Sequence, residues 1–189
     1  VDFSADVERI LTAVDGAVLV ISAAEGIQAH TGTLWNALRA RHIPVILFVN
    51  KLDRLGADIE NVWIEIRKEW HLEPVCMQSV QNIASANVVI TDLFSNDNMA
   101  ESIAETIVAG DEKLMDAYLE GAVPDFEILE KQLAQMVSRC KIVPMLFGSA
   151  RLNLGIEQLL DAMIKLLPAP NGDADSTLRA RVFGISYDK

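Results

Sequence analysis

The chain has 189 residues, which suits one domain or one domain with a fragment of another. Its formal net charge is −11, which argues against a general nucleic-acid-binding surface and leaves any contact with RNA to local patches or further domains. Hydrophobic residues make up 51% of the chain. No run approaches the length of about 18 apolar residues that a membrane-spanning helix needs, and no signal peptide is visible. We therefore expect a soluble cytoplasmic protein without a membrane partner.

Helix and strand patterns alternate from the start of the chain. Apolar residues recur on one helical stripe over residues 2–13, and Asp15-Gly16 then turns the chain into a strand at 17–22. A second helix is expected at 28–41. This alternation is typical of an α/β fold with three layers and a mostly parallel sheet.

An uninterrupted apolar run at 44–49 predicts a strand that is buried on both faces, as in a parallel sheet. Polar residues begin directly after it with Asn50, Lys51 and Asp53, where the carboxyl end of the strand should lie. Ligands of open α/β sheets bind outside that end. This loop is therefore the first candidate for a binding site.

The pattern Asn-Lys-x-Asp suits the recognition of guanine. Guanine presents two adjacent donors, the ring N–H and the exocyclic amine, and the Asp53 carboxylate could accept both, whereas adenine lacks this pair. Asn50 could hydrogen-bond the other edge of the base or brace neighbouring loops, while the Lys51 stem could lie over the ring. The alternative is a solvated loop with a helix-capping aspartate.

The middle of the chain is mostly helical in pattern, and we expect a reduced helical insert near 72–140. Asp58 is a candidate cap for a helix to about Trp70, and two short apolar runs at 74–80 and 87–94 predict a small hairpin or a longer sheet edge. Three helix patterns follow, marked by Met99, Ile103 and Ile107, then by residues 113–119, and then by Asp125 as a cap with Phe126, Leu129, Leu133 and Met136 inward.

A second apolar strand with a small-residue loop is expected at 142–147. The loop is Gly148-Ser149-Ala150, and small residues let backbone N–H groups approach a planar base. The Ala150 N–H could donate to the guanine carbonyl oxygen, which adenine lacks; the alternative is an ordinary tight turn. Two such loops indicate guanine more strongly than one. The last helix pattern spans 156–167, with Leu159, Leu160, Met163 and Leu167 inward.

We expect neither a metal site nor a disulfide in the chain. Cys76 and Cys140 have no close spacing to each other or to a histidine, so buried thiols are the favoured interpretation. The carboxylates between residues 111 and 130 indicate a solvated acidic face rather than a set of metal ligands.

Motifs in a fixed order carry a family resemblance, at residues 2–9, 14–23, 26–31, 110–121, 148–160 and 181–189. They resemble translational GTPases of the elongation factor G type, and within these they are most similar to the tetracycline-resistance ribosomal protection proteins. The resemblance omits only about residues 72–100. It implies GTP as the cofactor, the ribosome as a partner, and guanine binding by Asn50, Lys51, Asp53, Ser149 and Ala150.

The phosphate-binding half of that family's site has no counterpart in the sequence. A phosphate-binding loop needs GxxxxGK followed by Ser or Thr, and none of the ten glycines precedes a lysine. The resemblance implies that the Asp-x-x-Gly motif for Mg²⁺ would lie just before Val1, so the Mg²⁺ ligands and the catalytic groups are expected elsewhere in a parent protein. We expect a carboxy-terminal part of a GTP-binding domain at 1–168, a linker at 169–177 and the first strand of a β-barrel domain at 178–189.

Three hypotheses about function remain open on the sequence. The first is a fragment of a ribosome-associated translational GTPase, whose parent binds and hydrolyses GTP and could protect the ribosome against tetracycline. The second is a nonenzymatic base-binding half-domain or folding unit with no activity alone, and the third is an unrelated α/β protein with a coincidental motif. In the family fold the strand at 17–22 has a further neighbour, so we expect the isolated chain to self-associate there.

Overall fold

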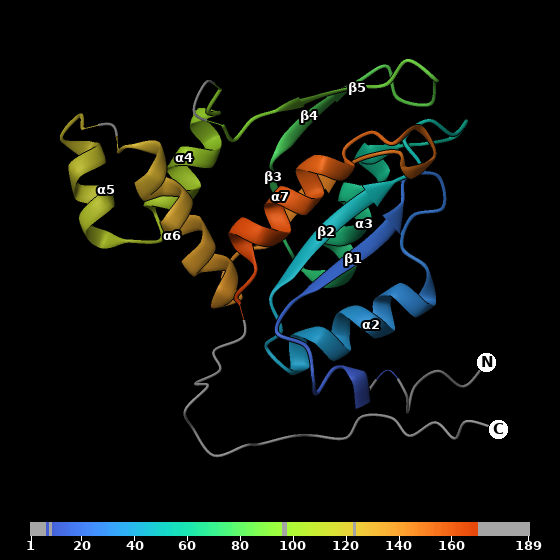
Figure 1. The fold of residues 1–189 in the computed structure, drawn as a ribbon, viewed down its shortest axis with the longest axis horizontal. Coiled ribbons are helices and arrows are strands. Elements are labelled where there is room, and N and C mark those ends of the chain that lie inside the picture. The colour runs from blue at the N-terminus through green and yellow to red at the C-terminus, as the bar shows by residue number, and fades with distance from the viewer. Residues whose placement is uncertain (1–6, 8, 96–97, 123, 170–189) are drawn as a thin grey trace.

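Four parallel strands form the central sheet (Figure 1). The computed structural model describes residues 7, 9–95, 98–122 and 124–169. The strands lie across the sheet in the order β1 (Ala17–Ser22), β2 (Val45–Asn50), β6 (Pro144–Phe147) and β3 (Val75–Cys76). All three pairings are parallel, and parallel neighbours need long crossover connections, which the helices supply. The predicted α/β class is confirmed.

Strand β2 lies between β1 and β6, which explains its uninterrupted apolar sequence. Successive side chains of a strand point to opposite faces. Val45, Leu47 and Val49 accordingly pack in the core on one face, and Ile46 and Phe48 pack in the core on the other. None of these five residues is more than 3% exposed.

Helices cover both faces of the sheet and complete the three layers. The helices α2 (Ala29–Ala40) and α3 (Ile59–Trp70) pack on one face, where the rings of Trp35 and Trp70 stack with centroids 4.6 Å apart. The other face is covered by α4 (Glu101–Val108), α6 (Phe126–Ser138) and α7 (Ile156–Leu166), and α5 (Glu112–Leu119) packs beside α4. Figure 1 shows α4, α5 and α6 grouped at one end of the molecule, away from α2.

The segment between α3 and α4 contains both structures that the sequence left open. Strand β3 lengthens the edge of the main sheet, and β4 (Gln78–Gln81) pairs with β5 (Val89–Asp92) as an antiparallel hairpin. The side chain of Gln78, the first residue of β4, is buried where the chain passes from the main sheet to the hairpin. Its Oε1 accepts from the Phe147 N–H at 2.9 Å and its Nε2 donates to Asp92 Oδ1 at 3.0 Å, so one amide joins the hairpin to the sheet.

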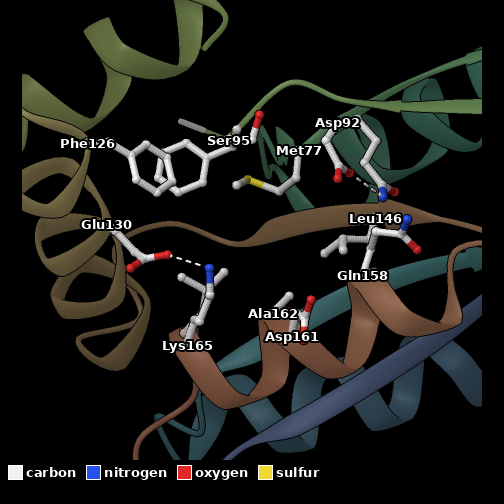
Figure 2. Close-up of a pocket in the computed structure, with 13 residues that line it drawn as sticks. Met77, Asp92, Ser95, Phe126, Glu130, Leu146, Gln158, Asp161, Ala162 and Lys165 are labelled. Atoms are coloured by element: carbon white, nitrogen blue, oxygen red, sulfur yellow. Dashed lines mark hydrogen bonds and ion pairs between the residues drawn. The ribbon is translucent and has the colours of Figure 1, made fainter. Parts of the chain in front are cut away.

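A cavity of about 300 Å³ lies between this hairpin, α6 and α7 (Figure 2). Its apolar wall includes Met77, Phe94 and Phe126, and the ion pair between Lys165 Nζ and Glu130 Oε1, 2.9 Å long, lies at its side. This ion pair also ties α7 to α6.

The helix patterns predicted at 28–41, 58–70 and 113–119 are confirmed as α2, α3 and α5. The inward face predicted for α7 is wrong in part, because Leu160 is 52% and Met163 is 36% exposed. The stripe of α7 that packs on the core consists of Ile156, Leu159, Ala162 and Leu166.

One predicted helix cap is also absent. Asp125 precedes α6 as expected, but its side chain makes no capping hydrogen bond to that helix.

Several expectations lie outside the described residues. These are half of the helix at 2–13, nearly all of the linker at 169–177 and the strand at 178–189. Within the described part of the chain, no helix has both the length and the apolar character needed to cross a membrane.

Candidate functional site

The two loops singled out in the sequence lie side by side at the carboxyl ends of β2 and β6. Val49 is in register with Phe147, so the residues that follow each strand are neighbours. The Gly148 N–H donates to the Val49 carbonyl at 2.9 Å, and the Leu52 N–H donates to the Gly148 carbonyl at 3.3 Å. The sheet therefore brings the two loops into one site.

Glycine is required at the start of the second loop. A Cβ atom on Gly148 would collide with the Phe48 ring and with the Leu154 carbonyl oxygen. Gly155 has a φ of +76°, and a Cβ there would meet the Phe147 carbonyl oxygen. These close approaches fold residues 148–155 tightly against the end of β6.

Asp53 is the most enclosed ionisable group of the site, with its side chain only 3% exposed. The hydroxyl of the fully buried Ser149 donates to Asp53 Oδ1, and Arg151 Nε donates to Asp53 Oδ2 at 2.7 Å. The hydrogen bond from Ser149 first, and then the contact with Arg151, hold the pKa of the Asp53 carboxyl below its ordinary value, although burial acts in the opposite direction. The carboxylate is thus an acceptor held in place by the second loop.

Asn50 braces both loops, which is one of the two roles that the sequence suggested for it. Its Oδ1 accepts from the Lys51 N–H at 2.7 Å and from the Ala150 N–H at 3.0 Å. The Ala150 N–H, expected to face the base, is therefore paired with Asn50 here.

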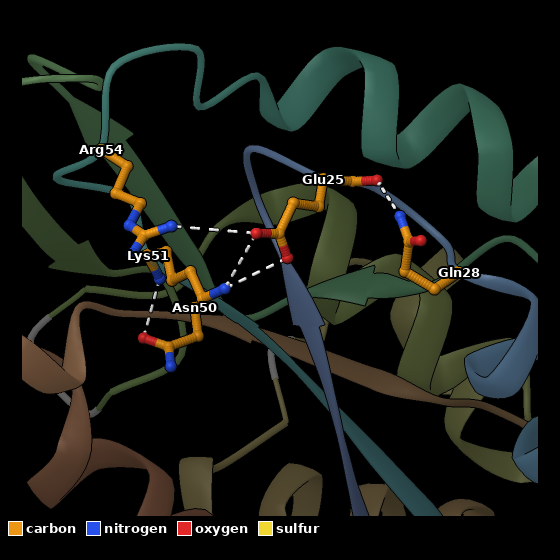
Figure 3. Close-up of polar contacts among 5 residues, drawn as sticks. All are labelled: Glu25, Gln28, Asn50, Lys51 and Arg54. Carbon is orange, nitrogen blue, oxygen red and sulfur yellow. Dashed lines mark hydrogen bonds and ion pairs between the residues drawn. The ribbon is translucent and has the colours of Figure 1, made fainter. Parts of the chain in front are cut away.

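Lys51 adopts a left-handed backbone conformation with a φ of +67°, which is uncommon outside glycine and is often found at functional sites. Its Nζ lies 3.1 Å from Glu25 Oε2 and 3.2 Å from Oε1, and Arg54 approaches the same carboxylate at 3.8 Å (Figure 3). The hydrogen bond and charge of Lys51 lower the pKa of Glu25. The lysine stem is held along the rim of the site by this pairing.

A shallow depression of about 220 Å³ adjoins these side chains at the ends of β1 and β2. Its lining residues include Glu25, Gln28, Thr31, Asn50 and Lys51. Figure 3 shows Gln28 turned back toward the Glu25 backbone, where its Nε2 donates to the carbonyl at 2.6 Å.

The sequence analysis did not predict Glu25, Arg54 and Arg151 as members of the site. Arg151 directly follows the predicted loop, so its position was a usable signal. Glu25 and Arg54 follow the ends of neighbouring strands β1 and β2, and adjacent strand ends meet at one edge of a parallel sheet.

Asp111, one of the carboxylates of the helical insert, has a structural role. Asp111 caps α5 by accepting from the Lys113 N–H at 3.0 Å and the Leu114 N–H at 3.1 Å. In the ranges that the structure describes, no group of three or more His, Cys, Asp or Glu side chains is arranged to hold a metal ion.

The parallel sheet with helices on both faces and polar loops at adjacent strand ends has the α/β fold of the P-loop GTPases. The chain belongs to the family described as the elongation factor Tu GTP binding domain, whose model matches residues 1–169. This finding confirms the resemblance to translational GTPases.

Relatives of known name include tetracycline resistance proteins. The chain is 38% identical over 98% of its length to TetP of Clostridium perfringens, and 33% identical over its whole length to TetM from transposon Tn916 of Enterococcus faecalis. The chain spans 28% of the length of each of these relatives. A crystal structure of the Thermus thermophilus protein ttk003000868 matches 89% of this chain and 29% of its own, with a TM-score of 0.77 and 25% identity.

Proposed function

We propose that this chain is the base-recognising part of a ribosome-associated translational GTPase. The observation that carries the proposal is the enclosed Asp53 carboxylate, 3% exposed and bonded by Ser149, beside the Ala150 N–H. An acceptor pair next to a backbone donor matches the donors and the carbonyl oxygen of guanine. Membership of a family described as a GTP binding domain supports the same ligand.

In the proposed complex Asp53 accepts from the guanine ring N–H and the exocyclic amine. The Ala150 N–H, which donates to Asn50 Oδ1 in this structure, donates instead to the guanine carbonyl oxygen. The Lys51 stem, held by Glu25, covers the ring plane. Ser149 keeps the carboxylate in position throughout.

The phosphates and Mg²⁺ have no assigned partners among these residues. Mg²⁺ neutralises charge on the transferring phosphoryl group in this class of reaction. We propose that the Mg²⁺ ligands lie elsewhere in the parent protein. We also propose that the parent acts in the cytoplasm, where ribosomes translate.

The experiment is a nucleotide-binding titration of the full-length protein with a fluorescent GDP, displaced by unlabelled GDP or ADP. We expect GDP to displace the probe at far lower concentration than ADP. Equal displacement by ADP would contradict guanine recognition.

A second experiment separates base recognition from hydrolysis. Catalysis of phosphoryl transfer depends on a phosphate loop with its lysine and on Mg²⁺, and the 189-residue sequence contains no GxxxxGK pattern. We therefore expect no GTP hydrolysis by the purified 189-residue chain, with or without ribosomes. Ribosome-stimulated phosphate release by this chain would contradict the prediction and would favour a different catalytic site.

We further propose that the parent protein confers tetracycline resistance by acting on the ribosome. The observation that favours this function over general elongation is the set of relatives named as tetracycline resistance proteins, at 32–38% identity in the pairs compared. Release of radiolabelled tetracycline from ribosomes by the full-length protein and GTP tests it. Release no faster than with GTP alone would contradict the proposal.

A further inference from the structure

Every group proposed to meet guanine is already bonded to the protein itself. Asp53 Oδ1 accepts from Ser149, Asp53 Oδ2 accepts from Arg151, and the Ala150 N–H donates to Asn50. Ser149 and Asn50 position these groups from within the loops. Arg151 is different, because it is a long cation with no role in the proposed contacts to the base.

Arg151 contacts Asp53 with a side chain that is largely exposed to solvent. The Ser149 side chain is fully buried and approaches the carboxylate from inside the fold, whereas the Arg151 side chain is 71% exposed. The Asp53 side chain is 3% exposed, and the exposed Arg151 side chain is one of the groups that cover it. A base that binds Asp53 Oδ2 would therefore have to replace the Arg151 hydrogen bond to that oxygen.

The guanidinium also imitates the chemistry of the guanine edge. A guanidinium presents N–H donors on a planar N–C–N unit. The ring N–H and exocyclic amine of guanine form a similar planar N–C–N unit with donors side by side. Arg151 therefore supplies to Oδ2, at 2.7 Å, the kind of hydrogen bond that guanine would supply.

We propose that Arg151 is an affinity-setting residue of the base site, which occupies Asp53 Oδ2 in the nucleotide-free protein and is displaced when guanine binds. This inference rests on the proposed guanine-binding function. Displacement opposes guanine binding and, in reverse, assists release, since the arginine can return to the carboxylate as the base leaves. Adenine nucleotides do not use the carboxylate, so Arg151 does not compete with them.

The test compares variants of the full-length protein by their affinity for fluorescent GDP and by its dissociation rate. Arg151→Ala should bind GDP roughly three- to tenfold more tightly, the range expected when a charge-assisted bond with one exposed partner no longer competes. Dissociation should slow by a similar factor. Affinity for ADP should not change.

Arg67→Ala is the matched control. Arg67 Nε lies 2.8 Å from Glu73 Oε2 in an exposed ion pair, so the substitution removes the same type of contact on α3. It should leave the affinity for GDP within about twofold.

A double-mutant cycle with Asp53→Asn assigns the effect to the carboxylate. In the Asp53→Asn background, Arg151→Ala should change the affinity for the best-bound nucleotide little. Weaker GDP binding by Arg151→Ala, or an equal gain in both backgrounds, would overturn the inference while leaving guanine recognition intact. If the unsubstituted protein does not prefer GDP over ADP, the proposed function fails first, and the inference fails with it.

Discussion

At the scale of single residues, the charge on Asp53 explains how the site can serve as an acceptor. The hydrogen bonds from Ser149 and Arg151 lower its pKa, so the carboxyl is ionised at neutral pH. A carboxyl whose pKa is lower in the folded than in the unfolded chain stabilises the folded state. This contribution to the free energy of unfolding is fully present above the ordinary pKa of about 3.9. That contribution is lost as the pH falls through the lower folded value.

The two cysteines differ in a way that predicts their reactivity. Burial, with a smaller effect of Glu73, raises the pKa of the Cys76 thiol to about 12, and burial also raises the pKa of Cys140. Thiolate is the reactive form. In the native chain at pH 8, iodoacetamide should therefore label Cys76 more slowly than Cys140, and both rates should rise with pH.

Peptide mass spectrometry at timed intervals measures both rates in one sample. The chain unfolded in urea is the control, where the two cysteines should react at similar rates. Labelling of Cys76 in the native chain as fast as in urea would show that its thiol is not buried.

At the scale of elements, helix caps that look alike in the sequence differ in the structure. Asp58 accepts from the Asn61 N–H at 2.9 Å and so caps α3, whereas Asp125 makes no such bond before α6. Losing a capping side chain costs about 1 kcal/mol.

Asp58→Ala should therefore lower the free energy of unfolding by about 1 kcal/mol. Asp125→Ala is the matched control, which should change it by less than about 0.5 kcal/mol. Urea unfolding followed by circular dichroism measures both. A larger loss for Asp125→Ala than for Asp58→Ala would mean that the caps are assigned wrongly.

The sequence predicted strands and helices well where the apolar residues leave one choice of buried face. The apolar run at 44–49 predicted a strand covered on both faces, and in the structure this strand lies between β1 and β6. In α7 the apolar residues extend around the helix, so the sequence did not say which of them face the core, and Leu160 was placed wrongly. Hairpin and sheet edge both occur in the 72–100 segment, and the Gln78 side chain joins them by hydrogen bonds to Phe147 and Asp92.

The sequence predicted that the loops after β2 and β6 lie together, but it did not predict the contacts within them. Asp53 and Ser149 were expected together because each follows an apolar strand and both loops suit the same base. The partners Glu25 and Arg151 depend on the directions of long side chains, which periodicity does not specify. The left-handed conformation of Lys51 likewise has no sequence signal, because it is not a glycine.

At the scale of the whole molecule, an apolar surface is exposed around the edge of the sheet. Strand β1 pairs with β2 on one side, and no strand pairs with its other side among the described residues. Val20 on β1 is 53% exposed, and on α7 Leu160 and Ile164 are 52% and 80% exposed. Unpaired edges and apolar patches recruit other chains.

We predict that the isolated 189-residue chain self-associates through β1, in keeping with the expectation from its sequence. Val20→Lys places a charge at that edge and should shift the chain toward the monomer in light scattering at micromolar concentration. Val89→Lys is the matched control, since Val89 is 47% exposed on the separate hairpin, and it should not change the association. A monomeric unsubstituted chain would contradict the prediction.

Recognition of guanine by Asp53 is tested most directly by the preference of Asp53→Asn for GTP or xanthosine triphosphate in the full-length protein. The amide replaces one acceptor with a donor, so a guanine donor faces a donor, at a cost of about 1–3 kcal/mol. Xanthine carries a carbonyl in place of the guanine amine, so the amide can pair with it. Competition binding should show a loss of GTP affinity and a gain for xanthosine triphosphate, whereas an unchanged preference for GTP would contradict the account.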